Sequence, residues 1–353
     1  MTSLLGLSAG LPEFLQARGL FVEVDSVGPV NVLAHDDVTV IVGNDREGGF
    51  IWVSRDGSSW TLIDDEAVAE LELVDGIANG PSIVLVGRAA EAEGVVLVSE
   101  DGRIFEERGR FRNSRHGTAP VGAALFGGGL VVMSDIIGND VEFHLSDANQ
   151  TWTPAQPSPV FDDGEGARDI ACSEEVCVGV GFLDATYRPE RDADAGVAWV
   201  STSGDDFQQV AYEFSTSTLD AVAWSPSGFL VVANDASDNG VVWHSTDGRE
   251  WRPVSGPFNE MTVDGVEAVA NAHLAFGHNP ASGDLVIWRS EDASNWSETV
   301  VAAALPEGSE LRSVASTPSG LIAVGINAET LDTLVWTSPN GNSWRQTAVK
   351  SAR

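Results

Sequence analysis

Seven degraded copies of one nine-residue pattern constrain the fold of this chain more than any other feature of its sequence. The first copy is WVSRDGSSW, residues 52–60, and the other six can be aligned with it on a single serine. The aligned serines are Ser54, Ser99, Ser146, Ser201, Ser245, Ser290 and Ser338. They follow one another at intervals of 45, 47, 55, 44, 45 and 48 residues, which is the length of a four-stranded sheet with its turns.

The pattern reads aromatic-x-Ser-x-Asp-Gly-x-x-aromatic, and each part has a physical role. Ser, Asp and Asn side chains hydrogen-bond the backbone two residues further on, and Gly accepts a positive φ, so the centre of each copy is expected to be a tight turn between two strands. Ten of the eleven tryptophans occupy the aromatic positions, where large rings are expected to fill the space between adjacent sheets. Short alternating strands surround the pattern, for example at 219–224, 229–234 and 241–245. The sequence therefore predicts an all-β chain with four short strands in each repeat.

These copies resemble the Asp-box, or BNR repeat, of sialidase-like β-propellers, from about residue 27 to residue 349. The resemblance implies a seven-bladed β-propeller of four-stranded antiparallel blades, with the motif forming the turn between the third and fourth strands. We interpret residues 21–353 as one propeller domain, and residues 1–20 as an N-terminal segment that is either flexible or the remnant of a signal or anchor. Residues 21–24 alternate like a strand, and pairing with the last blade would close the ring and remove exposed sheet edges.

The charge of the chain is strongly acidic, with 53 Asp and Glu residues against 19 Lys and Arg and a net charge of −34. Such a surface repels nucleic acid and anionic membranes at long range, so neither is expected as a partner. The charge serves solubility or a salty habitat, or it recruits cations or a basic partner. It also argues against the role of similar propellers with basic faces, which act as assembly factors in photosynthetic membranes. No segment reaches the roughly 20 apolar residues of a membrane span.

Cys172 and Cys177 are the two cysteines of the chain, and they flank the expected turn between the first and second strands of repeat four. That position places them across a hairpin, within reach of a disulfide if they are in register, and a pair of free structural thiols is the alternative. Two sulfurs without a nearby histidine make a poor zinc site, so no metal is expected there. The stretch also resembles a cysteine-bearing hairpin of exported propellers. This resemblance implies an extracellular or cell-surface location, although residues 1–20 lack the basic start and long hydrophobic run of a signal peptide.

Two connections depart from the regular repeat, on the face expected to lie opposite the motif turns. Residues 183–196 form the longest insertion, and residues 106–117 concentrate arginines in a chain that is otherwise poor in cations. The candidate binding residues in these connections are Arg108, Arg110, Arg112, Arg115, His116, Tyr187, Arg188 and Arg191. Together they would form a basic patch that binds a carboxylate, sulfate or phosphate group. Alternatively, these arginines only pair with the abundant carboxylates around them.

The sequence carries no recognisable set of catalytic residues. Sialidase chemistry, as the resemblance implies it, needs three arginines, a tyrosine nucleophile supported by a glutamate, and an acid/base aspartate. The two tyrosines, Tyr187 and Tyr212, stand in no such setting, and no serine lies in a nucleophile elbow. Loops such as 44–49 and 234–240 offer oxygen ligands for Ca²⁺, but none matches an EF-hand, and β-turns require the same Asn, Asp and Gly residues. We assign no catalytic residue and no cofactor, and Ca²⁺ stays as the alternative.

These observations favour a non-enzymatic recognition or assembly module that binds a protein, peptide or glycan on its loop face. The alternative is an exported glycoside hydrolase or lyase of sialidase-like architecture. A cluster of an arginine, two carboxylates and an exposed aromatic ring at the mouth of the central channel would distinguish the two, because the enzyme requires such a cluster.

Overall fold

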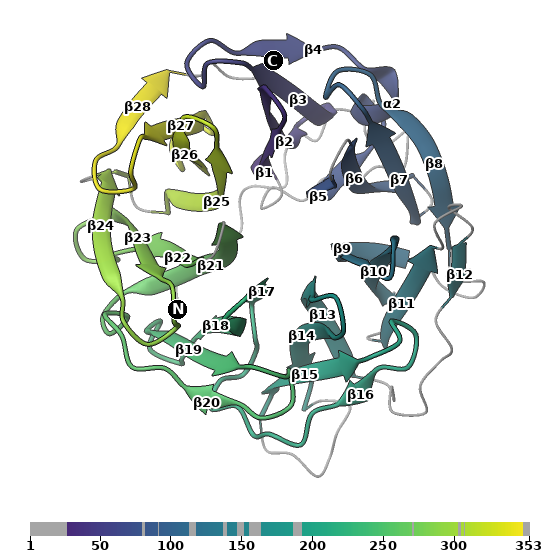
Figure 1. Cartoon of the computed structure of the whole chain (residues 1–353), viewed down its shortest axis with the longest axis vertical. Coiled ribbons are helices and arrows are strands. Elements are labelled where there is room, and N and C mark those ends of the chain that lie inside the picture. The colour runs from purple at the N-terminus through teal and green to yellow at the C-terminus, as the bar shows by residue number, and fades with distance from the viewer. Residues whose placement is uncertain are drawn as a thin grey trace, which may run out of the picture.

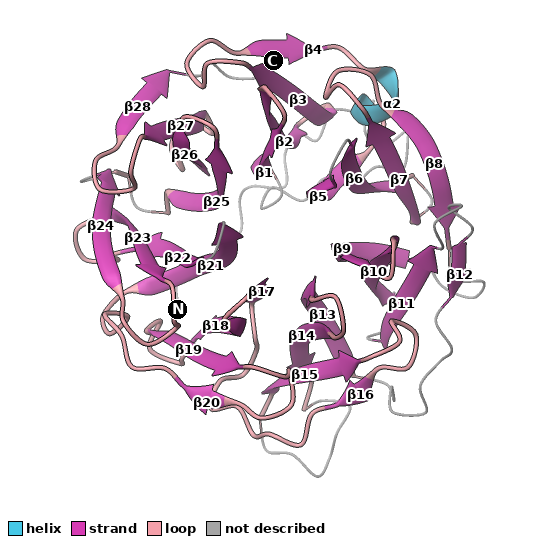
Figure 2. Ribbon diagram, viewed as in Figure 1, coloured by secondary structure: helices cyan, strands magenta, loops and turns pink. Residues whose placement is uncertain are grey.

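The computed structural model describes residues 27–79, 82–90, 92–112, 118–136, 140–146, 152–154, 164–185, 193–269, 272–302, 305–306 and 308–348. Over these residues the chain forms a ring of seven four-stranded antiparallel sheets (Figure 1). The prediction of an all-β, seven-bladed propeller is therefore confirmed. Figure 2 shows strands in every blade, together with one short helix in the described part, α2 (Glu66–Ala69), between blades 1 and 2.

The strands of the blades have the following bounds. Blade 1 contains β1 (Gly28–His35), β2 (Val38–Asp45), β3 (Gly48–Ser54) and β4 (Thr61–Ile63). Blade 2 contains β5 (Glu72–Asn79), β6 (Ser82–Ala89), β7 (Glu93–Ser99) and β8 (Glu106–Phe111). Blade 3 contains β9 (Thr118–Phe126), β10 (Gly129–Ile136), β11 (Asp140–Ser146) and β12 (Trp152–Pro154). Blade 4 contains β13 (Glu165–Cys172), β14 (Cys177–Leu183), β15 (Ala195–Ser201) and β16 (Gln208–Gln209). Blade 5 contains β17 (Ala221–Ser225), β18 (Gly228–Asn234), β19 (Gly240–Ser245) and β20 (Arg252–Pro253). Blade 6 contains β21 (Thr262–Val269), β22 (Ala272–His278), β23 (Leu285–Ser290) and β24 (Ser297–Ala302). Blade 7 contains β25 (Glu310–Thr317), β26 (Gly320–Ile326), β27 (Thr333–Ser338) and β28 (Arg345–Ala348).

Each blade is a meander in which neighbouring strands in space are also neighbours in sequence, running from the innermost strand to the outermost. Because these strands are antiparallel, the first-to-second turns and the third-to-fourth turns emerge on one face of the ring, which we call the turn face. The second-to-third loops and the connections between blades emerge on the opposite face, which we call the connection face.

The repeated motif forms the turn between the third and fourth strands, and in blade 1 its contacts explain its residue types. Ser54 Oγ donates to Asp56 Oδ1 at 3.1 Å and accepts a hydrogen bond from Gly57 N at 2.9 Å. Asp56 Oδ1 also accepts from the backbone N–H groups of Ser58 and Ser59, at 2.8 and 2.7 Å. Gly57 has a φ of 67°, which the absence of a Cβ makes accessible. The same serine and aspartate contacts recur in the turns of blades 2 and 5.

The tryptophans that begin the motif fill the space between blades, as the sequence predicts. Trp199, Trp243, Trp288 and Trp336 are each at most 2% exposed. Trp243 of blade 5 packs in one cluster with Val178 and Val180 of blade 4, for example. Trp52 is only partly buried, in the cluster that joins blades 7 and 1. The same residue position thus contributes less to the core at this one junction.

Polar side chains also join each blade to the next, by accepting a hydrogen bond from a backbone N–H group of the following blade. In blades 1, 3 and 5 the side chain comes from the end of the second strand, and the residues are Asn44, Asp135 and Asn234, bonded to Leu73 N, Ala167 N and Val263 N. In blades 2, 4 and 6 it comes from the innermost strand, and the residues are Asp75, Asp169 and Glu267, bonded to Ala123 N, Val222 N and Val314 N. At the junction of blades 7 and 1, Val32 N donates to Ser313 Oγ at 3.1 Å. The junction groups therefore alternate between two strands from blade 1 to blade 6.

The two cysteines lie directly opposite each other at the end of the β13–β14 hairpin and are joined by a disulfide. Their Cα atoms are 4.0 Å apart. The strand expected at residues 21–24 lies outside the described residues. No helix among the described residues has the length and apolar character needed to cross a membrane.

Candidate functional site

The innermost strands of all seven blades surround a central cavity of about 610 Å³. Backbone and small side chains form much of its wall, which also carries four carboxyl groups: Asp75, Asp169 and Glu267, and Asp264 at the rim. These carboxyl groups come from β5, β13 and β21, the innermost strands of alternate blades. Their side chains keep access to the cavity but are otherwise enclosed by protein.

Asp75 is held by donors from three blades and Asp169 by donors from two. Asp75 Oδ1 accepts from Gly76 N at 2.7 Å and from Asn31 Nδ2 of blade 1 at 3.1 Å, and its Oδ2 accepts from Ala123 N of blade 3 at 2.8 Å. Asp169 similarly accepts from Ile170 N at 2.7 Å and from Val222 N at 2.9 Å. Backbone N–H groups of two blades therefore fix the position of each of these two carboxyl groups.

Glu267 lies two residues later in its strand than Asp75 and Asp169 lie in theirs, but it lines the same cavity. Its Oε1 accepts from Ser313 Oγ at 2.5 Å and from Val314 N at 3.2 Å. Ser313 Oγ also lies 2.9 Å from Asn31 Oδ1. Asn31 and Ser313 therefore connect Glu267 with Asp75 across the seam between blades 7 and 1.

Burial changes the ionisation of these three groups more than their hydrogen bonds do. Loss of hydration raises the pKa of Asp75 to about 6, of Asp169 to about 7 and of Glu267 to about 8. The negative charge of Asp75 further raises the pKa of the other two carboxyl groups. A positive charge placed in the cavity would favour their ionised forms. Among the described residues, no group of three or more His, Cys, Asp or Glu side chains is arranged to hold a metal ion.

The rim of the cavity on the connection face is built by a bulge near the start of the innermost strand. In six blades the register shift leaves one residue unpaired, and in blade 5 the corresponding residue precedes β17. In chain order, the seven rim residues are Val30, Val74, Val121, Arg168, Asp220, Asp264 and Arg312. The rim is thus apolar over blades 1 to 3 and charged over blades 4 to 7.

Three of the charged rim residues, Asp264, Arg312 and Arg168, contact neighbouring side chains of their own blades. Asp264 Oδ1 lies 3.0 Å from His278 Nδ1, and Arg312 lies 3.1 Å from Glu310. Burial raises the pKa of Asp264 to about 6, and the hydrogen bond with Asp264 raises the pKa of His278. The Arg168 guanidinium stacks over a phenyl ring of its own blade, at 4.8 Å from the centroid. These contacts fix the charged side chains around the opening.

The structure places two of the sequence-predicted arginines, Arg108 and Arg110, at the outer edge of the ring instead of around its mouth. Arg108 and Arg110 lie on β8, the outermost strand of blade 2, where a connection had been expected. Arg108 pairs with Glu106 at 2.9 Å, and Arg110 pairs with Glu107 and Glu93 at 2.8 and 3.1 Å. The interaction with Glu107 raises the pKa of Arg110.

Of the remaining six candidate binding residues, only Arg112 lies within the described part of the chain. Arg112 lies 3.8 Å from Glu93. The other five, Arg115, His116, Tyr187, Arg188 and Arg191, lie outside the described residues. Anion binding by the full set of eight stays a prediction.

The three channel carboxyl groups were missed by the sequence reasoning, although the sequence carries a signal for them. The first strands of repeats two, four and six, LVDGIA, RDIACS and VEAVAN, each hold an acidic residue among apolar ones. A charge inside a strand that is otherwise buried requires a partner or a function. The residue types required of an enzyme site are partly present, because Arg312 and the half-buried Trp224 also line the cavity.

Comparisons with known proteins identify the fold but no family. No protein-family model matches the chain, and no curated protein matches its sequence. Among solved structures, the chain is similar to the WD40 repeats of RRP9, with a TM-score of 0.56 and 12% identity over 84% of this chain and 87% of that one. It is also similar to YCF48 bound to a D1 peptide, with a TM-score of 0.53 and 14% identity over 78% of this chain and 81% of that one. A chain of the mitotic checkpoint complex matches with a TM-score of 0.55 and 13% identity over 92% and 97% of the two chains. At these identities the likeness establishes a seven-bladed propeller.

Proposed function

We propose that this propeller is a non-enzymatic recognition module that binds a protein or peptide at the channel mouth on the connection face. A positively charged side chain of the partner enters the channel and ionises the carboxyl groups of Asp75, Asp169 and Glu267. The observation that carries the proposal is the presence of four carboxyl groups with raised pKa values in one cavity, these three and Asp264 at its rim. Burying an ionised carboxyl group is unfavourable, and a cation bound in the cavity offsets that cost because it attracts the negative charge.

Two further observations support a basic peptide as the partner. The net charge of −34 attracts a basic partner at long range and raises its rate of encounter. Of the apolar rim residues, Val30 lines the cavity, so residues that flank the charged side chain can pack against it. The structure of YCF48 with a D1 peptide is a case in which a similar ring holds a peptide.

The proposal is tested with a labelled library of short peptides that carry Lys or Arg at the central position. The same peptides with norleucine or citrulline at that position are the matched neutral ligands, and binding is measured by fluorescence anisotropy. The wild-type protein is expected to bind members of the basic set and not their neutral counterparts. The double variant Asp169→Asn/Glu267→Gln should bind about tenfold or more weakly.

The control is Asp205→Asn/Glu250→Gln, which removes the same two charges from exposed positions on the turn face. It should bind like the wild type. Equal affinity in the two double variants, or no preference for basic over neutral peptides, would contradict the proposal.

A glycoside hydrolase is the second candidate, because carboxyl groups with raised pKa values share the cavity with Arg312 and Trp224. A carboxyl group that stays protonated near neutral pH suits a general acid. Turnover of a fluorogenic glycoside that falls about 100-fold or more in Glu267→Gln would support this candidate. Absence of turnover across a panel of such glycosides would remove it.

We also propose that the repeats belong to the Asp-box type and that the protein acts at the cell surface or outside the cell. The turn contacts of Ser54 and Asp56 support the first point. The disulfide between Cys172 and Cys177 supports the second, because disulfides persist in oxidising compartments. A free-thiol count under denaturing, non-reducing conditions tests the disulfide, and two free thiols would contradict it.

A further inference from the structure

Two buried histidines hold the turn between the first and second strands of blade 5, on the turn face. The turn, residues 225–228 with the sequence SPSG, joins β17 to β18. His244 of β19 and His273 of β22 are both buried. His244 Nε2 lies 2.8 Å from the carbonyl oxygen of Ser227, and His273 Nε2 lies 3.1 Å from that of Gly228. The turn is therefore bonded to its own blade by one ring and to blade 6 by the other.

The hydrogen bonds of the two rings suit the neutral form of each histidine. A carbonyl oxygen can only accept, so each Nε2 carries a proton and donates it. The Arg252 guanidinium of β20 lies 3.3 Å from His244 Nδ1 and can only donate, so this nitrogen accepts. His273 Nδ1 lies 3.5 Å from Ser227 Oγ, whose hydroxyl group donates to it. A second proton on His244 would therefore set two donors of like charge against each other.

The surroundings of the two rings also disfavour a positive charge. The charged groups that act on them are Arg252 on β20 and the two rings themselves, on β19 and β22. Within the described part of the chain, neither ring lies within ion-pair distance of a carboxylate, whereas His144 lies 3.2 Å from Glu142. Burial lowers the pKa of His273 to about 4, and it also lowers the pKa of His244.

Blade 7 has nearly the same turn between its first two strands. Residues 317–320 have the sequence TPSG and join β25 to β26. The same side-chain bond closes both turns: Ser227 N donates to Ser225 Oγ at 3.2 Å, and Ser319 N donates to Thr317 Oγ1 at 3.3 Å. The two turns therefore share their sequence and their local geometry.

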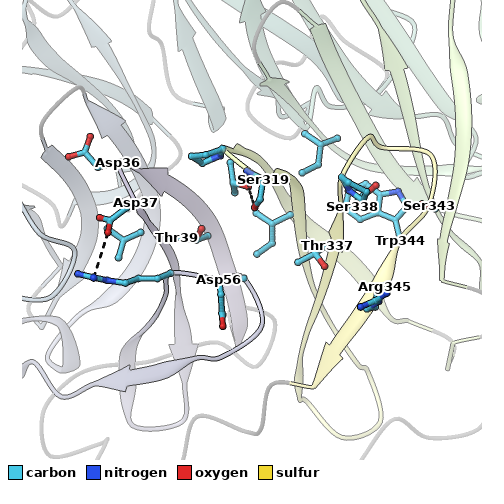
Figure 3. A pocket seen from close by; sticks show the side chains of 18 residues that line it. Asp36, Asp37, Thr39, Asp56, Ser319, Thr337, Ser338, Ser343, Trp344 and Arg345 are labelled. Atoms are coloured by element: carbon cyan, nitrogen blue, oxygen red, sulfur yellow. Dashed lines mark hydrogen bonds and ion pairs between the residues drawn. The ribbon is translucent and has the colours of Figure 1, made fainter.

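The turn of blade 7 lacks the two histidines. At the position of His244, directly before the repeat serine, blade 7 carries Thr337. At the position of His273, which pairs with the repeat serine of the following blade, blade 1 carries Thr39. Both threonines and Ser319 line a cavity of about 870 Å³ between blades 7 and 1 (Figure 3). The TPSG turn is thus an internal reference for the SPSG turn, with hydroxyl groups where the rings stand.

Acid favours opening of the junction that contains the two rings. In an opened junction each ring meets water and takes up a proton near its ordinary pKa of about 6.5, whereas the closed junction resists the proton. The stability that the rings contribute is therefore present above about pH 6.5 and is lost as the pH falls toward 4. The turn directly follows Trp224, which lines the central cavity.

We infer that His244 and His273 form an acid-sensitive clamp, which holds the SPSG turn and the adjoining Trp224 in place at neutral pH and releases them in acid. The clamp lies on the face opposite the proposed peptide site and requires no ligand, so it goes beyond the function proposed above.

The test is hydrogen–deuterium exchange of the full chain at pH 7 and at pH 5. Exchange in the SPSG turn is divided by exchange in the TPSG turn of the same molecule, which removes the direct effect of pH on the exchange reaction. Titration of His273 alone should raise this ratio about 20-fold from pH 7 to pH 5. A ratio that stays constant between the two pH values overturns the inference.

The double variant His244→Gln/His273→Gln identifies the groups responsible. A glutamine amide can donate to the same carbonyl oxygens but does not titrate, so the ratio should be equal at the two pH values. The single variant His273→Gln should show a smaller rise than the wild type, and it tests the clamp if the double variant does not fold. His144→Gln, on β11 of blade 3, is the matched control and should respond like the wild type. The same rise in the wild type and in His273→Gln would also overturn the inference.

Discussion

The aspartates of the repeat turns and the aspartates of the channel accept similar hydrogen bonds, yet their pKa values move in opposite directions. Asp56 accepts two backbone N–H groups while exposed to water, and these hold its pKa well below the usual range. Asp75 also accepts two backbone N–H groups, but its burial outweighs them and raises its pKa to about 6. Burial, not the number of donors, separates a permanent anion from a group that titrates near neutral pH.

The largest effect is expected from Asp75→Ala, which would leave buried N–H groups of two blades without an acceptor. Each unpaired buried donor costs about 1–3 kcal/mol, so the free energy of unfolding should fall by about 3 kcal/mol. Urea unfolding followed by tryptophan fluorescence measures this. If Asp75→Ala lowers the free energy of unfolding by less than an exposed substitution in a repeat turn does, Asp75 does not join the blades.

The next effect is on the pH dependence of stability, which should differ between the carboxyl groups of the channel and those of the repeat turns. Glu267 has a pKa of about 8 in the folded chain against an ordinary value of 4.5, so the folded state holds the proton more tightly. Its contribution to stability is therefore present at acid pH and is lost as the pH rises from about 4.5 to about 8. Across that range the free energy of unfolding of the wild type should fall relative to that of Glu267→Gln. Parallel stability curves for the two proteins would show that Glu267 does not titrate there.

A smaller effect is expected from Asp247→Ala in the repeat turn of blade 5. Asp247 accepts from Arg249 N and Glu250 N, at 2.8 and 2.9 Å, and removing it should cost about 1 kcal/mol, as for the loss of a helix cap. Its pKa is lowered in the folded state, so the stability it contributes is present above pH 4 and is lost as the pH falls further. The difference between wild type and variant should therefore stay constant from about pH 5 to about pH 9. A difference that changes in that range would contradict the comparison.

The smallest effect on stability is expected from Arg110→Ser on the outer strand β8. Exposed ion pairs such as those of Arg110 with Glu107 and Glu93 contribute about 0–1 kcal/mol. The triple replacement Arg110→Ser/Arg112→Ser/Arg115→Ser also tests the basic patch predicted from the sequence. If that patch exists, binding of sulfate or a carboxylate ligand should be abolished, and unchanged affinity would remove it.

The sequence was sufficient to predict the blades because each one is specified by local chemistry. The serine, aspartate and glycine of WVSRDGSSW determine a turn within nine residues, and the regular spacing of seven copies determines the number of blades. The tryptophan positions also predicted the buried rings between blades, since Trp199 and Trp288 are fully buried.

The candidate site was not predicted, because it depends on contacts between residues that are far apart in the chain. Asp75 and Asp169 are 94 positions apart and face one cavity only after the ring has closed. The arginine-rich stretch from residue 106 has the composition of a connection, because its charged residues conceal the alternation of β8. Its side chains pair locally, which a search for isolated cations cannot detect.

The alternating bonds between blades have a consequence for the symmetry of the ring. A pattern that repeats every two blades cannot close without a mismatch when the number of blades is odd. Here the mismatch falls between the last and first blades, where Ile326 occupies the position that Asn44 and Asn234 hold in their blades and a serine makes the bond to blade 1. For these acceptors the repeating unit is a pair of blades, and blade 7 is left without a counterpart at the junction where the ring closes.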